Sequence, residues 1–200
     1  MNVNEVIANL CHQLDGSVTI LPNDDVNHSQ SSNDTFPTAM NISAITSILK
    51  LKPAIEHLIA VLKEKQKQYW NVVKIGRTHI QDAKEITFGH EISGWASALT
   101  PDIQFINDTS KSLLELPIGG TAVGTGLNTT PDFAKAMVTE LATEYDLPFK
   151  TQNKFYGVAN HSVLTVTHGS IITLEADLMK IANDIRFLAS GPRAGYGELS

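Results

Sequence analysis

Apolar residues recur at helical spacing along most of this chain. Between residues 55 and 62 they fall at positions i, i+3, i+4 and i+7, which places them on one face of a helix running towards Trp70. The same period continues on the N-terminal side of Pro53, and we expect this proline to kink or split the helical run. Another apolar stripe extends over residues 174–188, after which Gly191–Pro192 predicts the end of that helix.

The rest of the chain contains further helical regions. A helix is predicted over residues 86–116, which Pro101 could interrupt, and shorter helices are predicted near residues 3–14 and 132–145. Clustered β-branched residues allow one brief extended segment at residues 72–75. The predicted fold class is therefore all-α, with long helices.

Two segments break the helical pattern. Residues 15–35 are rich in Asp, Asn, Ser and Pro, and residues 117–131 hold four glycines among Thr and Asn. Neither segment has an apolar period. Loops held at the ends of rigid elements are where binding and catalytic residues concentrate, so these segments are the first places to look for chemistry.

The composition limits the classes of function. The chain has 200 residues, a formal net charge of -6 and no basic runs, which argues against binding to nucleic acid or to an anionic membrane. No stretch reaches the roughly 18 apolar residues of a membrane span, and no secretory signal is visible. The single cysteine, Cys11, allows no internal disulfide, fits a reducing compartment and is expected to be a small buried residue. We expect a soluble intracellular protein.

The polar segment Leu21–Asp34 ends where a helix is predicted to begin. Ser31, Ser32 and Asn33 precede that helix, and we expect Asn33 or Asp34 to be its N-cap. Unpaired backbone N–H groups and the positive end of the helix dipole meet there, so adjacent hydroxyls and an amide suit a carboxylate or phosphate. An ordinary cap followed by a polar turn is the alternative, but capping accounts for only one or two of these polar residues.

A second polar segment, Gly76–Ala83, contains a histidine. His79 can exchange a proton near neutral pH, and Thr78 beside it can donate to an oxyanion. Arg77 and Asp82 could pair or fix the turn. A structural histidine preceding a helix is the alternative. The other histidines show no persuasive metal-ligand spacing, so no metal site is predicted.

The third segment, Gly119–Thr129, contains the spacing of a dinucleotide fingerprint only loosely. Because no convincing strand precedes it, we do not expect a dinucleotide-binding fold. Its glycines could let backbone amides approach a small ligand or let two chains pack closely. A glycine-rich connector without a binding role is equally consistent with the sequence.

In this order, the segments resemble class II fumarases of the fumarase/aspartase superfamily. The resemblance covers essentially the whole chain and rests on the stretches MNVNEVIAN (Met1–Asn9), PNDDVNHSQSSNDTFPTAM (Pro22–Met40), GRTHIQDA (Gly76–Ala83), GGTAVGTGLNT (Gly119–Thr129), NKF (Asn153–Phe155) and LMKIANDIRFLASGPR (Leu178–Arg193). It implies the superfamily's long-helix bundle, assembled as a homotetramer in which each active site combines loops from three subunits. Residues 1–200 would be part of the central helical domain.

The resemblance also implies roles for individual residues. Ser31, Ser32 and Asn33 would hold a substrate carboxylate, and Thr78 and His79 would contact the substrate from another subunit. The implied reaction is the reversible anti addition of water to fumarate, giving L-malate, a tricarboxylic acid cycle step without metal or organic cofactor. His79 would donate or accept a proton through a bound water. Aspartate ammonia-lyases typically have Thr in place of Ser32 and Gln in place of His79, so these two residues favour a fumarase.

The resemblance is weaker at a second position. Asn23 and Asp24 match a secondary dicarboxylate site that the family shows near its active-site entrance. The family commonly has histidine immediately before the proline there, whereas this chain has Leu21. Without that cationic donor, anion binding at the secondary site is in doubt.

Several parts of the family's pattern do not occur in these 200 residues. These parts are the N-terminal domain with the first substrate loop, the glycine- and serine-rich loop with the catalytic serine, a substrate-binding lysine and asparagine, and the C-terminal domain. Both ends are therefore expected to be truncations, and we expect the isolated chain to have little or no hydratase activity. A helical oligomerisation fragment without catalysis and an aspartate ammonia-lyase-like enzyme are the alternatives. The expected compartment is the cytoplasm, with the mitochondrion as an alternative.

Overall fold

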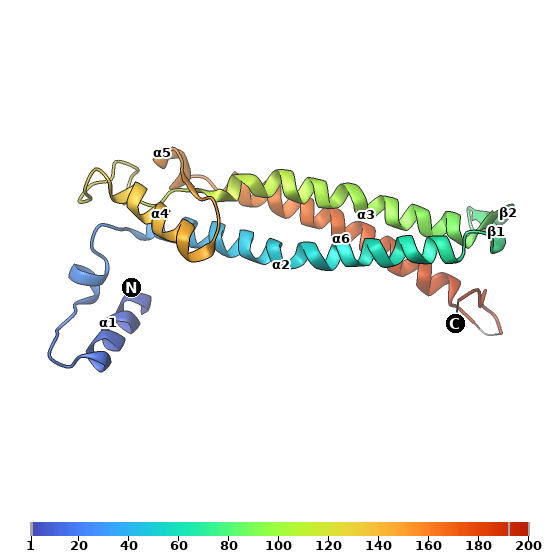
Figure 1. Cartoon of the computed structure of the whole chain (residues 1–200), viewed down its shortest axis with the longest axis horizontal. Coiled ribbons are helices and arrows are strands. Elements are labelled where there is room, and N and C mark those ends of the chain that lie inside the picture. The colour runs from blue at the N-terminus through green and yellow to red at the C-terminus, as the bar shows by residue number, and fades with distance from the viewer. Residues whose placement is uncertain (1, 192, 200) are drawn as a thin grey trace. The chain divides into compact units, whose positions relative to one another are not determined.

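The computed structural model describes residues 2–191 and 193–199, so Met1, Pro192 and Ser200 lie outside the described residues. The chain divides into two compact units: residues 1–45 with 112–162, and residues 46–111 with 163–200. Long helices dominate and the strands are few and short, which confirms the predicted all-α class (Figure 1). In the described part of the chain, no helix is long and apolar enough to cross a membrane.

The first unit contains short elements around the start of a long helix. In chain order its elements are α1 (Asn2–Leu14), the π-helical turn η1 (Pro22–Val26), the beginning of α2 (Ser32–Gln68), β3 (Glu115–Leu116), α4 (Phe133–Tyr145), β4 (Lys150–Thr151) and α5 (Lys154–Gly157). β3 and β4 pair in parallel. α1 and α4 confirm the two short helices predicted from the sequence. Cys11 on α1 is half-buried, so the expectation that it is buried was wrong.

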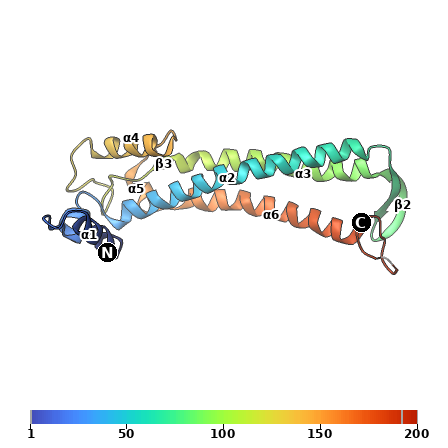
Figure 2. The same ribbon diagram turned by 60° about the horizontal axis from the view of Figure 1, so that its bottom comes forward.

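The second unit contains three helices that lie side by side in both views (Figures 1 and 2). They are the remainder of α2, α3 (Phe88–Ser110) and α6 (Ser162–Leu188), and α3 is followed by the 3₁₀ turn η2 (Lys111–Leu114). The predicted apolar stripes supply most of the core: Ile55, Ile59 and Leu62 of α2 and Leu174, Ile181 and Leu188 of α6 are buried. They pack in the same unit as Leu99 and Ile106 of α3, which are fully buried. Leu178 and Ile185, which belong to the predicted stripe over residues 174–188, are exposed.

Two prolines lie inside these helices. α2 continues through Pro53 and α3 through Pro101, so a split at Pro53 and an interruption at Pro101 are wrong, while the alternative of a kink at Pro53 stays a prediction. A proline removes one hydrogen bond and crowds the preceding turn, but burial of a long apolar face stabilises a helix over many residues. The predicted end of the last helix is confirmed, because α6 stops at Leu188; the Pro192 part of that prediction lies outside the described residues.

A β-hairpin connects α2 to α3. Its strands are β1 (Val73–Thr78) and β2 (Gln81–Thr87), paired antiparallel with Arg77 opposite Asp82 and Thr78 opposite Gln81. The predicted extended segment is therefore confirmed and is longer than expected. Strands occupy most of the polar segment Gly76–Ala83. Figure 2 shows the hairpin at the end of the second unit where α2 ends and α3 begins.

Candidate active site

A polar cleft of about 710 Å³ lies in the first unit. Its wall is formed by η1 and the residues that follow it, by Asn4 of α1, and by two short pieces of the glycine-rich segment. Asn23, Asp24, Ser31 and Ser32, four of the residues singled out from the sequence, line this cleft. The structure therefore brings the secondary-site pair and the two serines to the same cleft.

The N-terminus of α2 is built differently from the expectation. The helix begins at Ser32, and the Ser31 hydroxyl accepts the backbone N–H of Asn33 at 3.2 Å. The carbonyl of Ser31 accepts the N–H of Thr35 at 3.0 Å. Ser31 is thus the N-cap, and the expectation that Asn33 or Asp34 caps the helix was wrong.

Asp34 has another role. One oxygen of its carboxylate accepts the backbone N–H of Ser31 at 2.9 Å, so the side chain of Asp34 binds back to the N-cap residue. The other oxygen accepts the N–H groups of Gly119 and Thr121 at 2.9 Å each. Asp34 is fully buried. The carboxylate therefore anchors the glycine-rich segment to the first turn of α2.

The side chains of Asn33 and Ser32 differ in their hydrogen bonds and in their position relative to the cleft. The side-chain amide of Asn33 donates to the carbonyl of Ala122 at 2.7 Å, and Asn33 is not among the residues that line the cleft. Ser32 is exposed and lines the cleft, and its hydroxyl forms no hydrogen bond within the described part of the chain. Ser32 is therefore the helix-start side chain with a hydroxyl available to a ligand.

The glycine-rich segment connects elements and also forms part of the wall. Gly119 has a φ of 85°, and a Cβ at this position would lie 2.5 Å from the Cβ of Ala134, so the close packing against α4 requires glycine. Next to this segment, the Lys154 ammonium is buried without a hydrogen-bond partner in the described residues. Burial lowers the pKa of Lys154, and the charge of Asp34 acts in the opposite direction.

Thr78 and His79 belong to the second unit, at the tip of the β1–β2 hairpin. Both are exposed. His79 and Ile80 form the two-residue turn, with φ values of 54° and 61°. Positive φ at both turn positions matches a type I′ hairpin, but such turns favour Asn and Gly, and a β-branched residue there is strained. Strained backbone of this kind clusters at functional sites.

Comparisons with known proteins agree with this architecture. A family model described as lyase matches residues 1–200. The chain belongs to this lyase family. It is 54% identical over 202 residues to the class II fumarate hydratase of Listeria monocytogenes serotype 4b (strain F2365) and 48% identical over 205 residues to that of Bacillus subtilis (strain 168). Each alignment covers 100% of this chain and 44% of the relative, so the chain spans less than half the length of these curated relatives.

Solved structures of lyase-family proteins show the same fold. A fumarate lyase:delta crystallin from Brucella melitensis, bound to cobalt, has a TM-score of 0.92 and 36% identity, covering 98% of this chain and 44% of that one. The class II fumarase of Schistosoma mansoni has a TM-score of 0.88 and 41% identity, covering 97% and 45%. These matches confirm the resemblance to class II fumarases and the long-helix fold expected from it.

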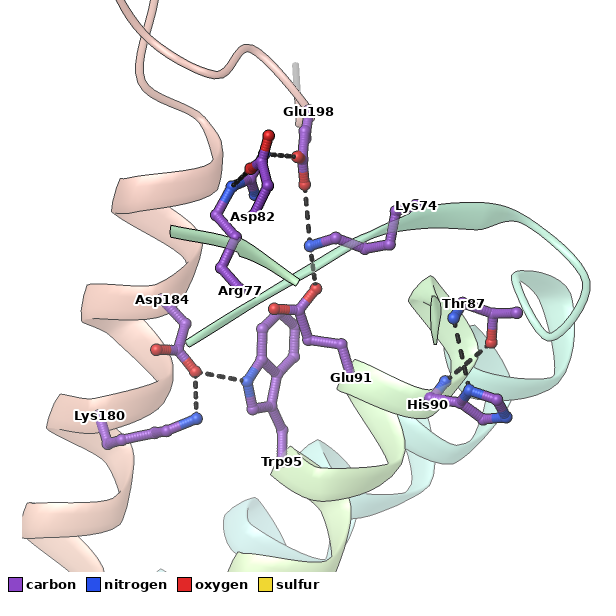
Figure 3. Close-up of polar contacts among 10 residues, drawn as sticks. All are labelled: Lys74, Arg77, Asp82, Thr87, His90, Glu91, Trp95, Lys180, Asp184 and Glu198. Atoms are coloured by element: carbon purple, nitrogen blue, oxygen red, sulfur yellow. Dashed lines mark hydrogen bonds and ion pairs between the residues drawn. The ribbon is translucent and has the colours of Figure 1, made fainter. Parts of the chain in front are cut away.

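Charged side chains from β1, from α3 and from the segment after α6 form a cluster next to the hairpin. Figure 3 shows Lys74 between the carboxylates of Glu91 and Glu198, with Arg77 reaching the other oxygen of Glu198. Arg77 also pairs with Asp82, with Nε to Oδ1 at 3.4 Å, as the sequence allowed. Sequence reasoning did not single out Lys74, Glu91 or Glu198, because only the fold brings Glu198 to the hairpin.

The charges of the cluster compensate one another. Burial would raise the pKa of the Glu198 carboxyl, but the hydrogen bonds and charges of Arg77 and Lys74 outweigh it and hold that pKa below its ordinary value. The hydrogen bond to Glu198 raises the pKa of the Arg77 guanidinium. Among the described residues, no group of three or more His, Cys, Asp or Glu side chains is arranged to hold a metal.

Proposed function

We propose that this protein is a class II fumarate hydratase, which adds water reversibly and in anti fashion to fumarate to give L-malate. The observation that carries the proposal is the alignment of the whole chain with proteins named class II fumarate hydratase at about half identity, 54% for the Listeria protein. Ser32 and His79 add to it, because both are the residues expected of a fumarase and not of an aspartate ammonia-lyase.

We propose that a substrate carboxylate binds at the start of α2. Removing a proton next to a carboxylate places two negative charges on that carboxylate, and donors aimed at it in advance lower the barrier. The exposed Ser32 hydroxyl, the Ser31 hydroxyl and the Asn33 amide surround a helix N-terminus, whose dipole also favours an anion. For Asn33 this role requires the amide to exchange its contact with Ala122 for one with the substrate.

Thr78 and His79 are the proposed second component of the site, supplied by another subunit. An exposed hairpin tip can reach into a neighbouring chain, and a turn closed by cross-strand pairing holds its side chains in a defined direction. Thr78 donates a hydrogen bond to the substrate. His79 exchanges a proton with it through a bound water.

Self-association follows from the surface of α6. Several of its apolar side chains are exposed in the single chain, namely Val166, Ile172, Leu178, Met179, Ile185 and Phe187. Exposed apolar residues repeated along one helix are typical of an assembly surface. We propose a homotetramer in which the sites are shared between subunits.

The remaining assignments complete the proposal. Residues 1–200 form part of the central helical domain, and the serine base comes from sequence outside them. Asn23 and Asp24 form a secondary dicarboxylate position that Leu21 weakens. The reaction uses neither a metal nor an organic cofactor, the protein binds no nucleic acid, and its compartment is the cytoplasm.

An absorbance assay tests the activity. Fumarate absorbs in the ultraviolet and L-malate does not, so the protein expressed from its complete gene should remove the absorbance and form L-malate. We expect His79→Asn to lower kcat by about 100-fold, the loss typical of a general acid–base group. Release of ammonia from aspartate instead of malate formation would assign the protein to the ammonia lyases.

A further inference from the structure

The carboxylate of Glu198 joins two cations of the hairpin strand β1. Its Oε1 accepts from Nη2 of Arg77 at 2.6 Å, and its Oε2 lies 2.8 Å from Nζ of Lys74. All three side chains are largely buried, with exposed fractions of 17% for Glu198, 14% for Arg77 and 5% for Lys74. Because these charges are withdrawn from water, their pairing is screened less than that of surface ion pairs.

The backbone around Glu198 is docked on the end of α6. The N–H of Glu198 donates to the carbonyl of Leu188 at 2.9 Å, and the N–H of Tyr196 donates to the hydroxyl of Ser190 at 3.1 Å. A Cβ at Gly195 would lie 2.2 Å from the backbone carbon of Ser190, so this return of the chain is possible only with glycine. Hydrogen bonds and close packing therefore fix the path of the chain around Glu198 against the end of α6.

The ring of Tyr196 also contacts Arg77, through a cation–π interaction. The guanidinium carbon of Arg77 lies 4.0 Å from the centre of the Tyr196 ring, which in turn lies 4.6 Å from the ring centre of Phe187 on α6. Arg77 is thus held by Glu198, by the face of Tyr196 and by Asp82 across the hairpin. Its next neighbour in the strand is Thr78.

The hairpin tip needs such support. His79 and Ile80 both have positive φ, and the pairing irregularity between Ile75 and Arg77 interrupts the ladder just before the tip. A strained turn persists only where the surrounding structure over-determines it. The contacts of the buried Arg77 side chain hold the strand in place next to the turn. Arg77 is one residue from Thr78 and two from His79 in the sequence.

We propose that Glu198 is a positioning residue for the hydration reaction. Through Arg77 and Lys74 it holds the β1–β2 turn in the geometry that presents Thr78 and His79 to the substrate. Glu198 does not touch the substrate itself. The inference rests on the proposed function, since the roles of Thr78 and His79 belong to it.

Kinetics test this positioning in the protein expressed from its complete gene. We expect Glu198→Gln, which keeps the shape and removes the charge, to lower kcat by about 10-fold or more while KM changes by less than about threefold. Glu85→Gln removes one charge from an exposed position on the same hairpin and should leave kcat unchanged. Glu198→Asp keeps the charge, should recover part of the rate, and replaces Glu198→Gln if that variant does not fold.

A double variant separates positioning from general support of the fold. If Glu198 acts through His79, Glu198→Gln should have no further effect on kcat in the His79→Asn background, within about twofold. A loss there as large as in the wild type would overturn the inference, because it would show that Glu198 acts independently of His79.

Amide hydrogen exchange tests whether Glu198 holds the hairpin turn in place, and it does not depend on catalytic activity. Glu198→Gln should speed exchange of the amides of residues 77–82 by about 10-fold relative to Glu85→Gln, while the amides of α3 stay protected. Unchanged exchange at the hairpin tip would overturn the positioning role. Absence of fumarate hydration in the wild type would instead contradict the proposed function and leave the exchange result to be judged separately.

Discussion

The buried carboxylate of Asp34 accepts the backbone N–H of Thr121 at 2.9 Å. The same oxygen accepts the N–H of Gly119, and the other oxygen caps the first turn of α2 through Ser31. One side chain therefore fixes the position of Ser31 and Ser32 relative to Thr121, across the cleft that they line. The candidate carboxylate site depends on this residue even though Asp34 is fully buried.

Asp34→Asn should destabilise the first unit. The amide group of asparagine can replace only one carboxylate oxygen as an acceptor, so its NH₂ would face at least one backbone N–H. We expect a loss of about 2–3 kcal/mol in the free energy of unfolding, measured by urea denaturation. Asp132→Asn is the matched control, because Asp132 is exposed at the start of α4 and forms no capping hydrogen bond there. Equal stabilities of the two variants would contradict the anchoring role.

Most of the helical fold could be predicted from apolar periodicity. The stripe over residues 55–62 became a buried face of α2, and the stripe over residues 174–188 is buried at Leu174, Ile181 and Leu188, because burial of apolar side chains outweighs local preferences. Leu178 and Ile185 of the second stripe are exposed in the single chain. The same physics explains why Pro53 and Pro101 did not break their helices. Local preference was overridden where tertiary packing was extensive.

The hairpin could not be predicted in full, because its turn residues are unusual. His79–Ile80 lacks the glycine that normally marks a two-residue turn, so only the β-branched residues before it indicated a strand. The N-cap was misplaced for another reason. Asp34 is a good capping residue locally, but its carboxylate is required by amides from residues 119 and 121, which the local sequence does not show.

Among the candidate site residues, Ser31, Ser32 and His79 lie in polar segments that residue type brings to notice, and their proposed roles come from the resemblance to class II fumarases. Glu198 could not be found in this way, because its proposed positioning role depends on a contact with Arg77, which lies 121 positions away in the chain. Long-range ion pairs leave no periodic trace in a sequence. Only the fold identifies them.

Asp102 should make stability depend on pH. Its side chain is fully buried in α3, burial raises the pKa of its carboxyl, and the nearby Asp177 raises that pKa further. A raised folded-state pKa means that the folded form binds more protons than the unfolded one between the two pKa values, so stability falls as pH rises through that window. Asp102→Asn removes this dependence.

Urea unfolding of the two proteins from pH 4 to pH 8 measures the effect. Asp102→Asn should be more stable than the wild type at pH 8, and the difference should shrink towards pH 4, where Asp102 is protonated. A constant difference across this range would show that Asp102 does not titrate in the window. Asp108→Asn is the control, because Asp108 on the same helix is exposed to solvent.

Leu21→His should restore dicarboxylate binding at the secondary position. Leu21 is 47% exposed and lies directly before η1, which carries Asn23 and Asp24 into the cleft. A protonated histidine there would supply the missing cation. Calorimetric titration with L-malate below pH 6 should show added binding in Leu21→His, whereas Leu21→Gln, a polar residue without charge, should behave as the wild type. Equal binding in all three proteins would remove Leu21 as the cause of a weak secondary site.

The central claim is that fumarate is hydrated at sites shared between subunits, with Ser32 from one chain and His79 from another. Two variants of the protein expressed from its complete gene, Ser32→Ala and His79→Asn, should each be nearly inactive. When they are denatured together in equal amounts and refolded, random assembly gives roughly one site in four an intact Ser32 and an intact His79. The account predicts that fumarate hydration returns to about a quarter of the wild-type rate. A mixture no more active than the separate variants would contradict it.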